Sequence, residues 1–321
     1  MARILGMGNA LVDIMTKMDS DDYLHRFGLP KGSMTLVSAE TSSMVQEGTR
    51  HLEKTIRSGG SAANTIHGLA NLGAETGFIG KIGQDELGKV FYDDLVTSGI
   101  NPHLSASKTR TGHAVALMSP DAERTFATYL GAAVELQESD LSQELFSQYD
   151  IFHIEGYIVQ NHSLLESALK LARKVGLKVS LDMASYNVVD QNRDFLEEML
   201  KHYVDIVFAN EDESRSLTGM EPEEALEKLS RMCEISVVKI GSKGSLIKSK
   251  NRTWKIGIID LPCIDTTGAG DLYASGFLYG IEKGYPLDKC GNLGALLAGR
   301  VIAETGPKIP KERWKEIRRM I

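Results

Sequence analysis

Hydrophobic and polar positions alternate with two different periods along the middle of the chain. Short runs rich in β-branched residues predict strands at 150–159, 178–182, 205–209 and 235–240. The segments between them show the period of amphipathic helices, which we place at 162–175, 193–203 and 223–232. Strands that alternate with helices of this length indicate a buried parallel sheet, and ligands of such sheets bind beyond the carboxyl ends of the strands.

Two stretches, 11–37 and 100–130, do not follow this rhythm. They contain strand-like runs, such as 113–118 and 124–129, without a helix-length segment between consecutive strands. We interpret both stretches as antiparallel pieces of a separate small sheet. The sequence therefore predicts an α/β fold with a large domain, whose mostly parallel sheet is flanked by helices, and a small β-sheet lid. The large domain comprises 1–10, 38–99 and 131–321, and the lid comprises 11–37 and 100–130.

The charge balance and the cysteines narrow the possible partners. The chain has 36 Lys and Arg against 43 Asp and Glu, a net charge of −7, so no basic excess is available to neutralise nucleic-acid phosphates. No apolar run approaches the length of a membrane span. The 3 cysteines are far apart and form no CxxC pair, which argues against a disulfide framework or a zinc site and favours a cytoplasmic location.

Two glycine pairs resemble nucleotide-binding motifs without completing them. The segment Gly83 to Val90 nearly matches a P-loop, but Val90 offers no hydroxyl to magnesium, and two acidic residues stand where backbone must cradle phosphate. We expect a turn that starts a helix there. Gly6 and Gly8 supply half of a dinucleotide fingerprint, but the third glycine is missing and the chain continues as a strand. This argues against a dinucleotide-dependent oxidoreductase.

Two other glycine clusters each precede a predicted helix. Gly59 and Gly60 stand before a helix of small residues at 61–72 that ends at Gly73. Backbone amides exposed there could bind hydroxyls or anions, and a tight turn with close helix packing explains the same residues equally well.

The second cluster is Asp265-Thr-Thr-Gly-Ala-Gly-Asp271, which leads into a predicted helix at 272–283. Unblocked amides of Gly268, Ala269 and Gly270, together with the helix dipole, would hold an anion or a developing negative charge. Asp271 beside them could accept a proton from a hydroxyl. A simple helix cap explains Asp271 alone, but it does not explain the two glycines or Asp265.

At these residues the sequence resembles the PfkB family of small-molecule kinases, which includes ribokinase-like and adenosine kinase-like enzymes. The elements at 59–64 and 265–271 resemble its two signatures, and the likeness extends over the chain through the segments 8–14 and 210–213. The resemblance implies a ribokinase-like fold and in-line transfer of the ATP γ-phosphoryl group to a primary hydroxyl of a sugar or nucleoside. It also implies that Asp271 is the general base and that the amides of 268–270 stabilise charge.

The same resemblance implies roles for further residues. Those that would hold the acceptor are Asn9, Asp13, Gly59, Gly60 and Asn64, and those on the nucleotide side are Asn210, Lys239, Gly241, Gly244 and Asn292. Many relatives carry Thr or Ser at the position of Lys239, so here a charge replaces a hydroxyl.

Metal sites are implied as well. Glu213 would organise Mg²⁺, directly or through water, although Asn210 and Glu213 equally fit a capping box. Asp265 and Thr267 would bind a monovalent cation such as K⁺, and a polar turn is the alternative.

The acceptor and the assembly stay open at this stage. The opening at 8–14 and the lid segment 21–36 favour an adenosine kinase-like enzyme. A simple-sugar kinase acting on ribose, fructose or 2-keto-3-deoxygluconate is the alternative, and an inactive ligand-binding regulator is the non-enzymatic one. We expect a small-molecule substrate, no nucleic acid or membrane, and either a monomer or a homodimer paired through its lids.

Overall fold

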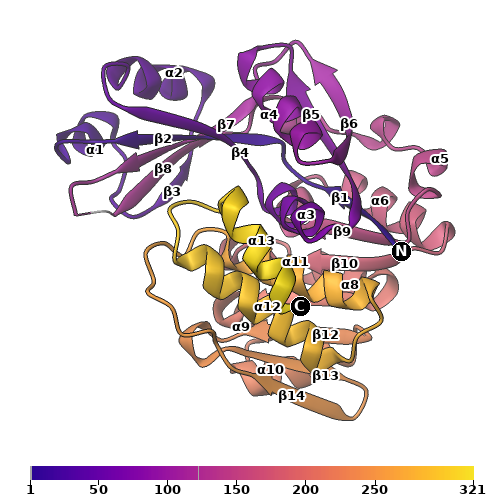
Figure 1. Ribbon diagram of the computed structural model, residues 1–321. Helices are drawn as coiled ribbons and strands as arrows, with labels where there is room; N and C mark the ends of the chain where they lie inside the picture. The colour runs from indigo at the N-terminus through magenta and orange to yellow at the C-terminus, as the bar shows by residue number, and fades with distance from the viewer. Residues whose placement is uncertain (1, 122) are drawn as a thin grey trace.

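The computed structural model describes residues 2–121 and 123–321, and its strands form a 9-stranded sheet and a 5-stranded sheet (Figure 1). Met1 and Ala122, which fall inside the predicted ranges 1–10 and 100–130, lie outside the described residues. The expected combination of a large, mostly parallel sheet with a small second sheet is confirmed. Within the described residues, no helix has both the length and the apolar character needed to cross a bilayer.

The large sheet has the strand order β14-β13-β12-β11-β10-β9-β1-β5-β6. Neighbouring strands are parallel from β6 to β12, whereas β13 and β14 are added antiparallel at one edge. The strands are β1 Arg3–Met7, β5 Glu75–Gly83, β6 Ile100–Ser107, β9 Ile151–Glu155, β10 Lys178–Asp182, β11 Ile206–Asn210, β12 Ile235–Lys239, β13 Ser245–Ser249 and β14 Arg252–Ile256.

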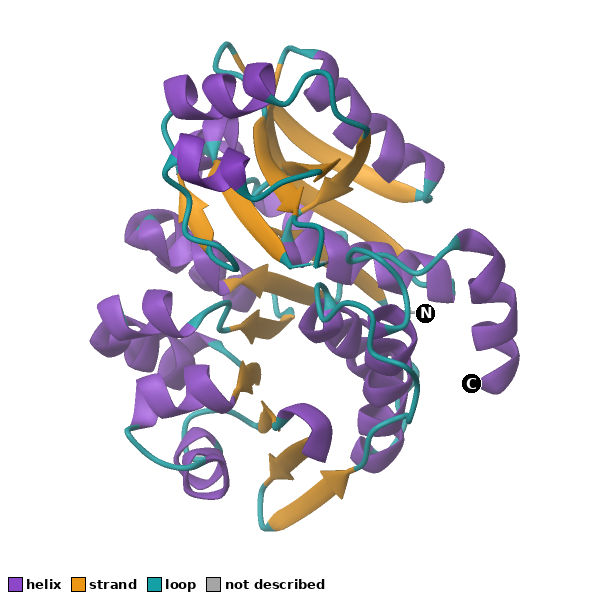
Figure 2. Cartoon of the chain, turned by 90° about the vertical axis from the view of Figure 1, so that its left-hand side faces the viewer, coloured by secondary structure: helices purple, strands orange, loops and turns teal. Residues whose placement is uncertain are grey.

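Helices cover both faces of this sheet (Figure 2). The α-helices of the chain are α1 Asp22–Phe27, α2 Ala39–Gly48, α3 Ser61–Leu72, α4 Glu86–Thr97, α5 Gln143–Phe146, α6 His162–Lys174, α7 Tyr186–Gln191, α8 Arg193–Tyr203, α9 Glu211–Thr218, α10 Pro222–Leu229, α11 Ala269–Glu282, α12 Leu287–Ile302 and α13 Lys311–Met320. Four 3₁₀ helices are η1 Gly131–Glu135, η2 Glu138–Asp140, η3 Gly156–Gln160 and η4 Gly241–Lys243.

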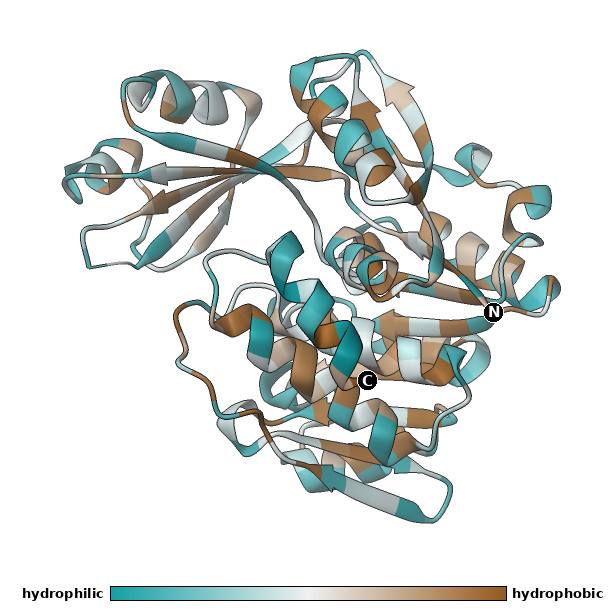
Figure 3. Cartoon of the chain, viewed as in Figure 1, coloured by the Kyte–Doolittle hydropathy of each residue, from teal (hydrophilic) through white to brown (hydrophobic). Residues whose placement is uncertain are grey.

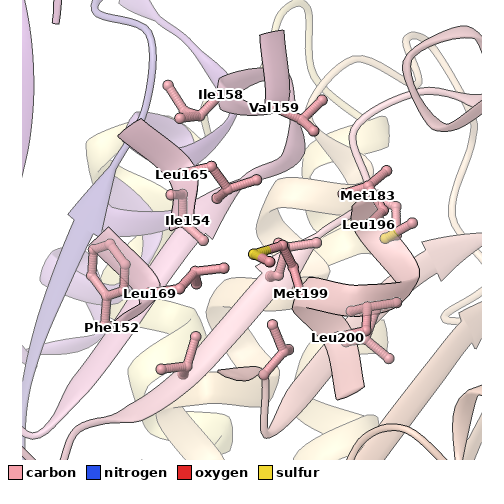
Figure 4. Close-up of a cluster of buried hydrophobic side chains, with 14 of the residues drawn as sticks. Phe152, Ile154, Ile158, Val159, Leu165, Leu169, Met183, Leu196, Met199 and Leu200 are labelled. Atoms are coloured by element: carbon pink, nitrogen blue, oxygen red, sulfur yellow. The ribbon is translucent and has the colours of Figure 1, made fainter. Parts of the chain in front are cut away.

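Each face of the large sheet has its own hydrophobic core. On one face, Leu165 and Leu169 of α6 and Met199 of α8 pack over Phe152 and Ile154 of β9 (Figure 4). On the other face, α3, α4, α11 and α12 pack against apolar side chains of the same strands. Figure 3 shows the apolar strands enclosed by helices whose outer sides are hydrophilic, α13 among them. Burial of the strands on both faces explains why they read as continuous apolar runs.

The small sheet has the order β3-β8-β7-β2-β4. Its strands are β2 Leu11–Lys17, β3 Met34–Leu36, β4 Lys54–Gly59, β7 Gly112–Met118 and β8 Arg124–Tyr129. Phe27 of α1 and Val45 of α2 pack with Ile14 and Val115 on the covered face. The sheet is mixed and not antiparallel throughout, because β2 pairs with β7 and β3 pairs with β8 in parallel.

Strand pairing corrects the predicted lid boundaries at two places. The strand β4, which falls in the stretch 38–99 assigned to the large domain, pairs with β2 in the small sheet. The strand β6, which falls in the stretch 100–130 assigned to the lid, continues the large sheet beside β5. The reason is physical: β4 is a largely exposed edge strand with a weak apolar signal, and β6 completes a β-α-β unit through α4.

The incomplete nucleotide motifs have structural explanations. Asp85 is the N-cap of α4 and accepts a hydrogen bond of 2.9 Å from the amide of Gly88, so the expected turn before a helix is confirmed. A Cβ at Gly6 would collide with Ile66 of α3, and one at Gly8 would collide with the Glu155 carboxylate. These two glycines therefore allow α3 and Glu155 to pack directly on β1.

Close packing of α11 on α12 gives the first testable prediction. A Cβ at Gly276 would collide with the carbonyl oxygen of Leu293. We expect Gly276→Ala to lower the free energy of unfolding by about 1–3 kcal/mol, because backbone must move to admit the methyl group. Gly257→Ala is the matched control, since its Cβ would meet no atom within 4 Å. Equal denaturant midpoints for the two variants would contradict this packing.

Candidate active site

Four neighbouring strands of the large sheet each end at a polar residue. Glu155 ends β9, Asp182 ends β10, Asn210 ends β11 and Lys239 ends β12. These strands are parallel and adjacent, so the four side chains meet at one edge, where the sequence predicted the ligand to bind.

The first turns of α3 and α11 meet at the same edge through Asp271. The helix α11 begins at Ala269, earlier than predicted, so Asp271 lies in its first turn. Its Oδ1 accepts a hydrogen bond of 2.7 Å from the Ser61 hydroxyl, and its Oδ2 accepts one of 2.9 Å from Asn64 Nδ2. Burial raises the pKa of Asp271 to about 6, while both hydrogen bonds oppose the rise. A carboxylate oriented in this way can accept a proton at neutral pH.

The anion loop, residues 265–270, precedes Asp271. Gly268 has φ +77°, a left-handed conformation, and its Cβ would lie 2.7 Å from Cα of Pro307. Only glycine fits there. The first amides of a helix have no partner within the helix, so those of Ala269 and Gly270 lie at the positive end of the α11 dipole. Both residues line the cavity described below.

Lys239 brings a positive charge to this loop. Its ammonium donates a hydrogen bond of 3.0 Å to Asp182 Oδ2, and it lies 3.0 Å from the position that a Cβ of Gly270 would occupy. Burial disfavours the charge, but Asp182 and Glu213 outweigh burial and raise the pKa of Lys239. Asp182 was missed by the sequence reasoning, although its place at the end of a predicted strand was a usable signal.

Asn210 and Glu213 form the capping box that was one of their two interpretations. Asn210 Oδ1 accepts from the Glu213 amide at 2.8 Å, and Glu213 accepts from the Asn210 amide at 2.8 Å and from Nδ2 at 2.7 Å. Burial raises the pKa of Glu213 to about 7. Both carboxylate oxygens already accept hydrogen bonds, so these residues fit Mg²⁺ through water better than directly. No cluster of three or more potential metal-ligating side chains occurs in the described ranges.

A cavity of about 600 Å³ opens on the outer side of Lys239 and the anion loop. Of the predicted nucleotide-side residues, it is lined by Asn210, Lys239, Gly241 and Gly244. Its far wall is apolar and is formed by Ile258, Ile259, Leu261, Ala295, Ala298, Gly299 and Ile302. Small and apolar side chains of this kind suit a flat ring system.

Asn292 requires a correction. It is exposed on α12 and does not line the cavity, whereas Ala295 and residues further along the same helix do. With 3.6 residues per turn, a shift of three positions restores the same helix face, so the sequence pattern could not distinguish neighbouring turns.

The predicted acceptor residues lie on the other side of Asp271. The backbone amide and the Nδ2 of Asn9 each donate a hydrogen bond of 2.9 Å to Glu155 Oε1, and Glu155 Oε2 accepts one of 2.8 Å from the Ala62 amide. Glu155 is buried, and burial raises its pKa to about 7. Sequence reasoning assigned no role to Glu155. Its carboxylate joins the end of β1 to the start of α3 and so positions both.

Asp13 and Asn64 offer polar groups on this side. Burial raises the pKa of Asp13 to about 6, Lys308 opposes the rise and Asp271 adds to it. Asn64 is 6% exposed, and its Oδ1 is a buried acceptor without a hydrogen-bond partner in the structure. An unused buried acceptor is costly, and a hydroxyl donor from a ligand would satisfy it.

Gly59 and Gly60 allow these groups to approach each other. Gly60 has φ +93°, and a Cβ there would collide with the Asn9 carbonyl. A Cβ at Gly59 would collide with the Asp13 carboxylate. The structure therefore has the tight turn and close packing that were one interpretation of this glycine pair. The polar groups that the family resemblance implied for binding the acceptor lie beside the turn.

Two long-range ion pairs at the site were missed by the sequence reasoning. Arg124 of β8 contacts the Asp265 carboxylate, and Lys308 donates to Asp94 Oδ2 at 2.7 Å and to the Ser58 hydroxyl at 2.5 Å. Burial raises the pKa of Asp265, but Arg124 and Thr267 outweigh it and hold the pKa below its usual value. Nothing in the local sequence marks either basic residue, since their partners are distant along the chain.

Comparison with known proteins gives consistent matches. The model of the pfkB family of carbohydrate kinases matches residues 32–314. The crystal structure of adenosine kinase from Sinorhizobium meliloti is 32% identical, with a TM-score of 0.90, and the match covers 100% of this chain and 99% of that one. A probable sugar kinase from Rhizobium etli is also 32% identical, with a TM-score of 0.88, and 98% of both chains is covered.

A curated relative is more distant. An uncharacterized sugar kinase from Archaeoglobus fulgidus is 29% identical over 244 residues, which make up 75% of this chain and 96% of the relative. Kinases of sugars and of nucleosides are thus both represented among the similar proteins.

The raised pKa of Asp271 predicts a stability effect that depends on pH. Its folded-state pKa of about 6 exceeds the ordinary 3.8, so the folded protein binds this proton more tightly than the unfolded chain. The ionised group therefore costs stability progressively as pH rises from about 4 to 6 and in full above that range. We expect Asp271→Asn to raise the free energy of unfolding by up to about 3 kcal/mol at pH 8 and by little near pH 4.

Thermal unfolding of the variant and the unaltered protein across this pH range measures the difference. Asp93→Asn is the control, because Asp93 is exposed on α4 and should show no such trend. A stability difference for Asp271→Asn that is independent of pH would contradict the burial of an ionised carboxylate.

Proposed function

Because the chain belongs to the pfkB family of carbohydrate kinases, we propose that it transfers the γ-phosphoryl group of ATP to a primary hydroxyl of a nucleoside, in the manner of an adenosine kinase. One observation carries the proposal: Asp271 is fixed by Ser61 and Asn64 directly beside the amide-rich start of α11. A proton acceptor and an anion site share one helix turn, which is the arrangement that phosphoryl transfer to a hydroxyl requires.

In the proposed reaction, Asp271 accepts the proton of the acceptor hydroxyl as that oxygen attacks the γ-phosphorus and the bond from the γ-phosphorus to the β,γ-bridging oxygen breaks, which releases ADP. Ser61 and Asn64 keep the carboxylate in place, and its pKa of about 6 leaves it ionised at neutral pH. Amides of Gly268, Ala269 and Gly270 hold the negative charge of the transferring group. Phosphoryl transfer depends mainly on such positioning and electrostatics.

Lys239 adds a fixed charge on the nucleotide side of the anion loop. Asp182 holds the ammonium beside Gly270, so the charge is in place before the nucleotide binds. We assign it to the phosphates of ATP, with the nucleotide ring against the apolar wall of the cavity. When bound with the nucleotide, Mg²⁺ neutralises phosphate charge, and Glu213 and Asn210 would hold it through water.

The inner face of the lid favours a nucleoside as the acceptor. Side chains alternate between the two faces of a strand, so residues in register with Asp13 share its face. The apolar side chains of this face are Leu11, Met15, Met34, Leu36, Ala114, Ala116, Met118 and Phe126, and its polar side chains include Lys17, Thr55, Arg57, Arg124 and Thr128. An apolar cover suits a heteroaromatic base, while Asp13 and Asn64 suit ribose hydroxyls. The similarity to the Sinorhizobium adenosine kinase over the whole chain supports the same acceptor class.

A simple-sugar kinase is the second candidate, favoured by the equal identity to the probable sugar kinase from Rhizobium etli. An inactive ligand-binding regulator is disfavoured, because such a protein has no use for Asp271, Lys239 and the anion loop together.

The acceptor assignment predicts the outcome of a substrate panel. Release of ADP from Mg-ATP is measured with adenosine, other nucleosides, ribose, fructose and 2-keto-3-deoxygluconate, alongside Asp271→Asn. We expect the highest kcat/KM with adenosine and a loss of about a thousandfold or more in the variant, because the proton acceptor is gone. A higher kcat/KM with a sugar would establish the second candidate. No acceptor-dependent ADP above the variant's background would refute the kinase assignment for this site.

The pKa of Asp271 also predicts the acidic limb of the rate profile. Only the ionised carboxylate accepts a proton, so kcat/KM should rise between about pH 5 and pH 7 with a midpoint near 6. The raised pKa of Asp13, also about 6, adds to the same limb. A flat profile over this range would contradict a proton-transfer role for Asp271.

A further inference from the structure

We propose that Arg124 acts as an internal cation for the anion loop. Its guanidinium takes the place beside Asp265 that a bound monovalent cation would otherwise take, so the loop is completed when the lid closes over it. This role of Arg124 is separate from the proposed function, because it concerns what orders the loop and not which acceptor is used.

Both oxygens of the Asp265 carboxylate already accept hydrogen bonds from neighbouring groups. Its Oδ1 accepts from the Thr267 amide at 3.0 Å and from the Thr267 hydroxyl at 2.7 Å. Its Oδ2 accepts from the Gly306 amide at 2.5 Å and from Arg124 Nη1. A carboxylate has about four lone-pair sites, so all of them are used here.

The burial and the opposite charges of Arg124 and Asp265 also support this role. The side chains of Arg124 and Asp265 are only 11% and 6% exposed, so their charges compensate each other away from water. Arg124 Nη1 also lies 3.4 Å from the Thr267 hydroxyl. A K⁺ ion at Asp265 and Thr267 would find the side-chain oxygens of both residues already engaged and would face a buried guanidinium that is always protonated. These residues, as arranged here, do not fit the monovalent cation that the family resemblance implied.

The position of Arg124 in the fold couples this charge to the lid. It lies on β8 of the small sheet, in register with Met118, and Met118 is in register with Lys17 of β2, so Arg124 shares the face of Asp13. Asp265 is part of the large domain and is the first residue of the anion loop. The ion pair therefore forms only when the inner face of the lid lies over that loop.

Asp265 connects the charge of Arg124 to the anion loop, where the phosphoryl group would bind. It ties Thr267 to Gly306, and Pro307 packs directly on Gly268. By neutralising Asp265, Arg124 thus helps to hold together the segments 265–267 and 306–307, which shape the amides of 268–270. Arg124 acts through Asp265, so it is a positioning residue.

The test compares K⁺ with tetramethylammonium, which is too large for the site, both as chlorides at about 100 mM so that ionic screening is equal. The proteins are the unaltered enzyme, Arg124→Ala, Arg124→Lys and Arg50→Ala. Arg50 is the matched control, because its ion pair with Glu47 at the end of α2 is largely exposed to solvent. The measurements are Tm without substrates, and kcat and KM for ADP release.

We expect the unaltered enzyme and Arg50→Ala to have the same Tm within about 1 °C in the two salts and the same kcat within about twofold. Arg124→Ala should lose about tenfold or more in kcat in tetramethylammonium, since the anion loop is no longer held. K⁺ should raise its Tm and restore part of its kcat, because a vacated carboxylate then accepts the ion. Arg124→Lys should retain more kcat than Arg124→Ala in tetramethylammonium.

Three results would overturn the proposal: K⁺ activation of the unaltered enzyme, full activity of Arg124→Ala, or no response of Arg124→Ala to K⁺ in both Tm and kcat. If Arg124→Ala does not fold, the unaltered enzyme and Arg124→Lys still decide the matter. The Tm measurements need no acceptor, so they remain decisive even if the proposed kinase activity fails.

Discussion

The hydrogen bonds from Ser61 and Asn64 to Asp271 join the first turns of two helices that are distant in sequence, and the site is built around this junction. The helices can meet because they pack without intervening bulk: a Cβ at Gly68 would lie 2.8 Å from Cβ of Ser275, and the Ser275 hydroxyl donates to the Thr65 carbonyl at 2.7 Å. On the same side, Glu155 anchors the start of α3 to β1. The small residues before and within α3 therefore determine where the Asp271 carboxylate lies.

Burial of charge is the cost of this arrangement. Desolvation raises the pKa values of Asp13, Glu155, Glu213 and Asp271, so each of these carboxylates resists ionisation in the folded protein. Lys239 and Lys308 lie among them and supply compensating positive charge. Sites of this kind trade stability for a preorganised electrostatic environment. Under the proposed function, the phosphates of ATP would add negative charge to an edge that already carries several buried carboxylates, and Lys239 would offset part of it.

Local and distant interactions differ in how far the sequence predicts them. The helix 61–72 with its end at Gly73, the strand 178–182 and the helix 193–203 follow from periodicity and capping within a few residues, and the structure has them with the same bounds. The glycines of the anion loop are equally local, because a left-handed φ at Gly268 is a property of one residue.

Arg124 and Lys308 are different: their partners Asp265 and Ser58 are 141 and 250 positions away, and only the folded sheets bring them together. The edge strand β4 was missed for a related reason, since its exposed residues carry no apolar pattern and its identity depends on the neighbour it pairs with.

The segment from Gly306 to Lys308 shows how these distant contacts form one unit. Its first residue donates its amide to Asp265, its second packs on Gly268, and its third binds Ser58 at the end of the lid strand β4. Arg124 reaches the same Asp265 from the lid strand β8, near the opposite edge of the small sheet. The lid strand β4 is thus tied to the anion loop through three consecutive residues of the large domain, and β8 is tied to it directly through Arg124. The environment of Asp265 and Gly268 therefore depends on where the lid lies. Asp13 belongs to the same small sheet as Arg124, so the position of its carboxylate and the contacts of Asp265 are set by the same structural unit.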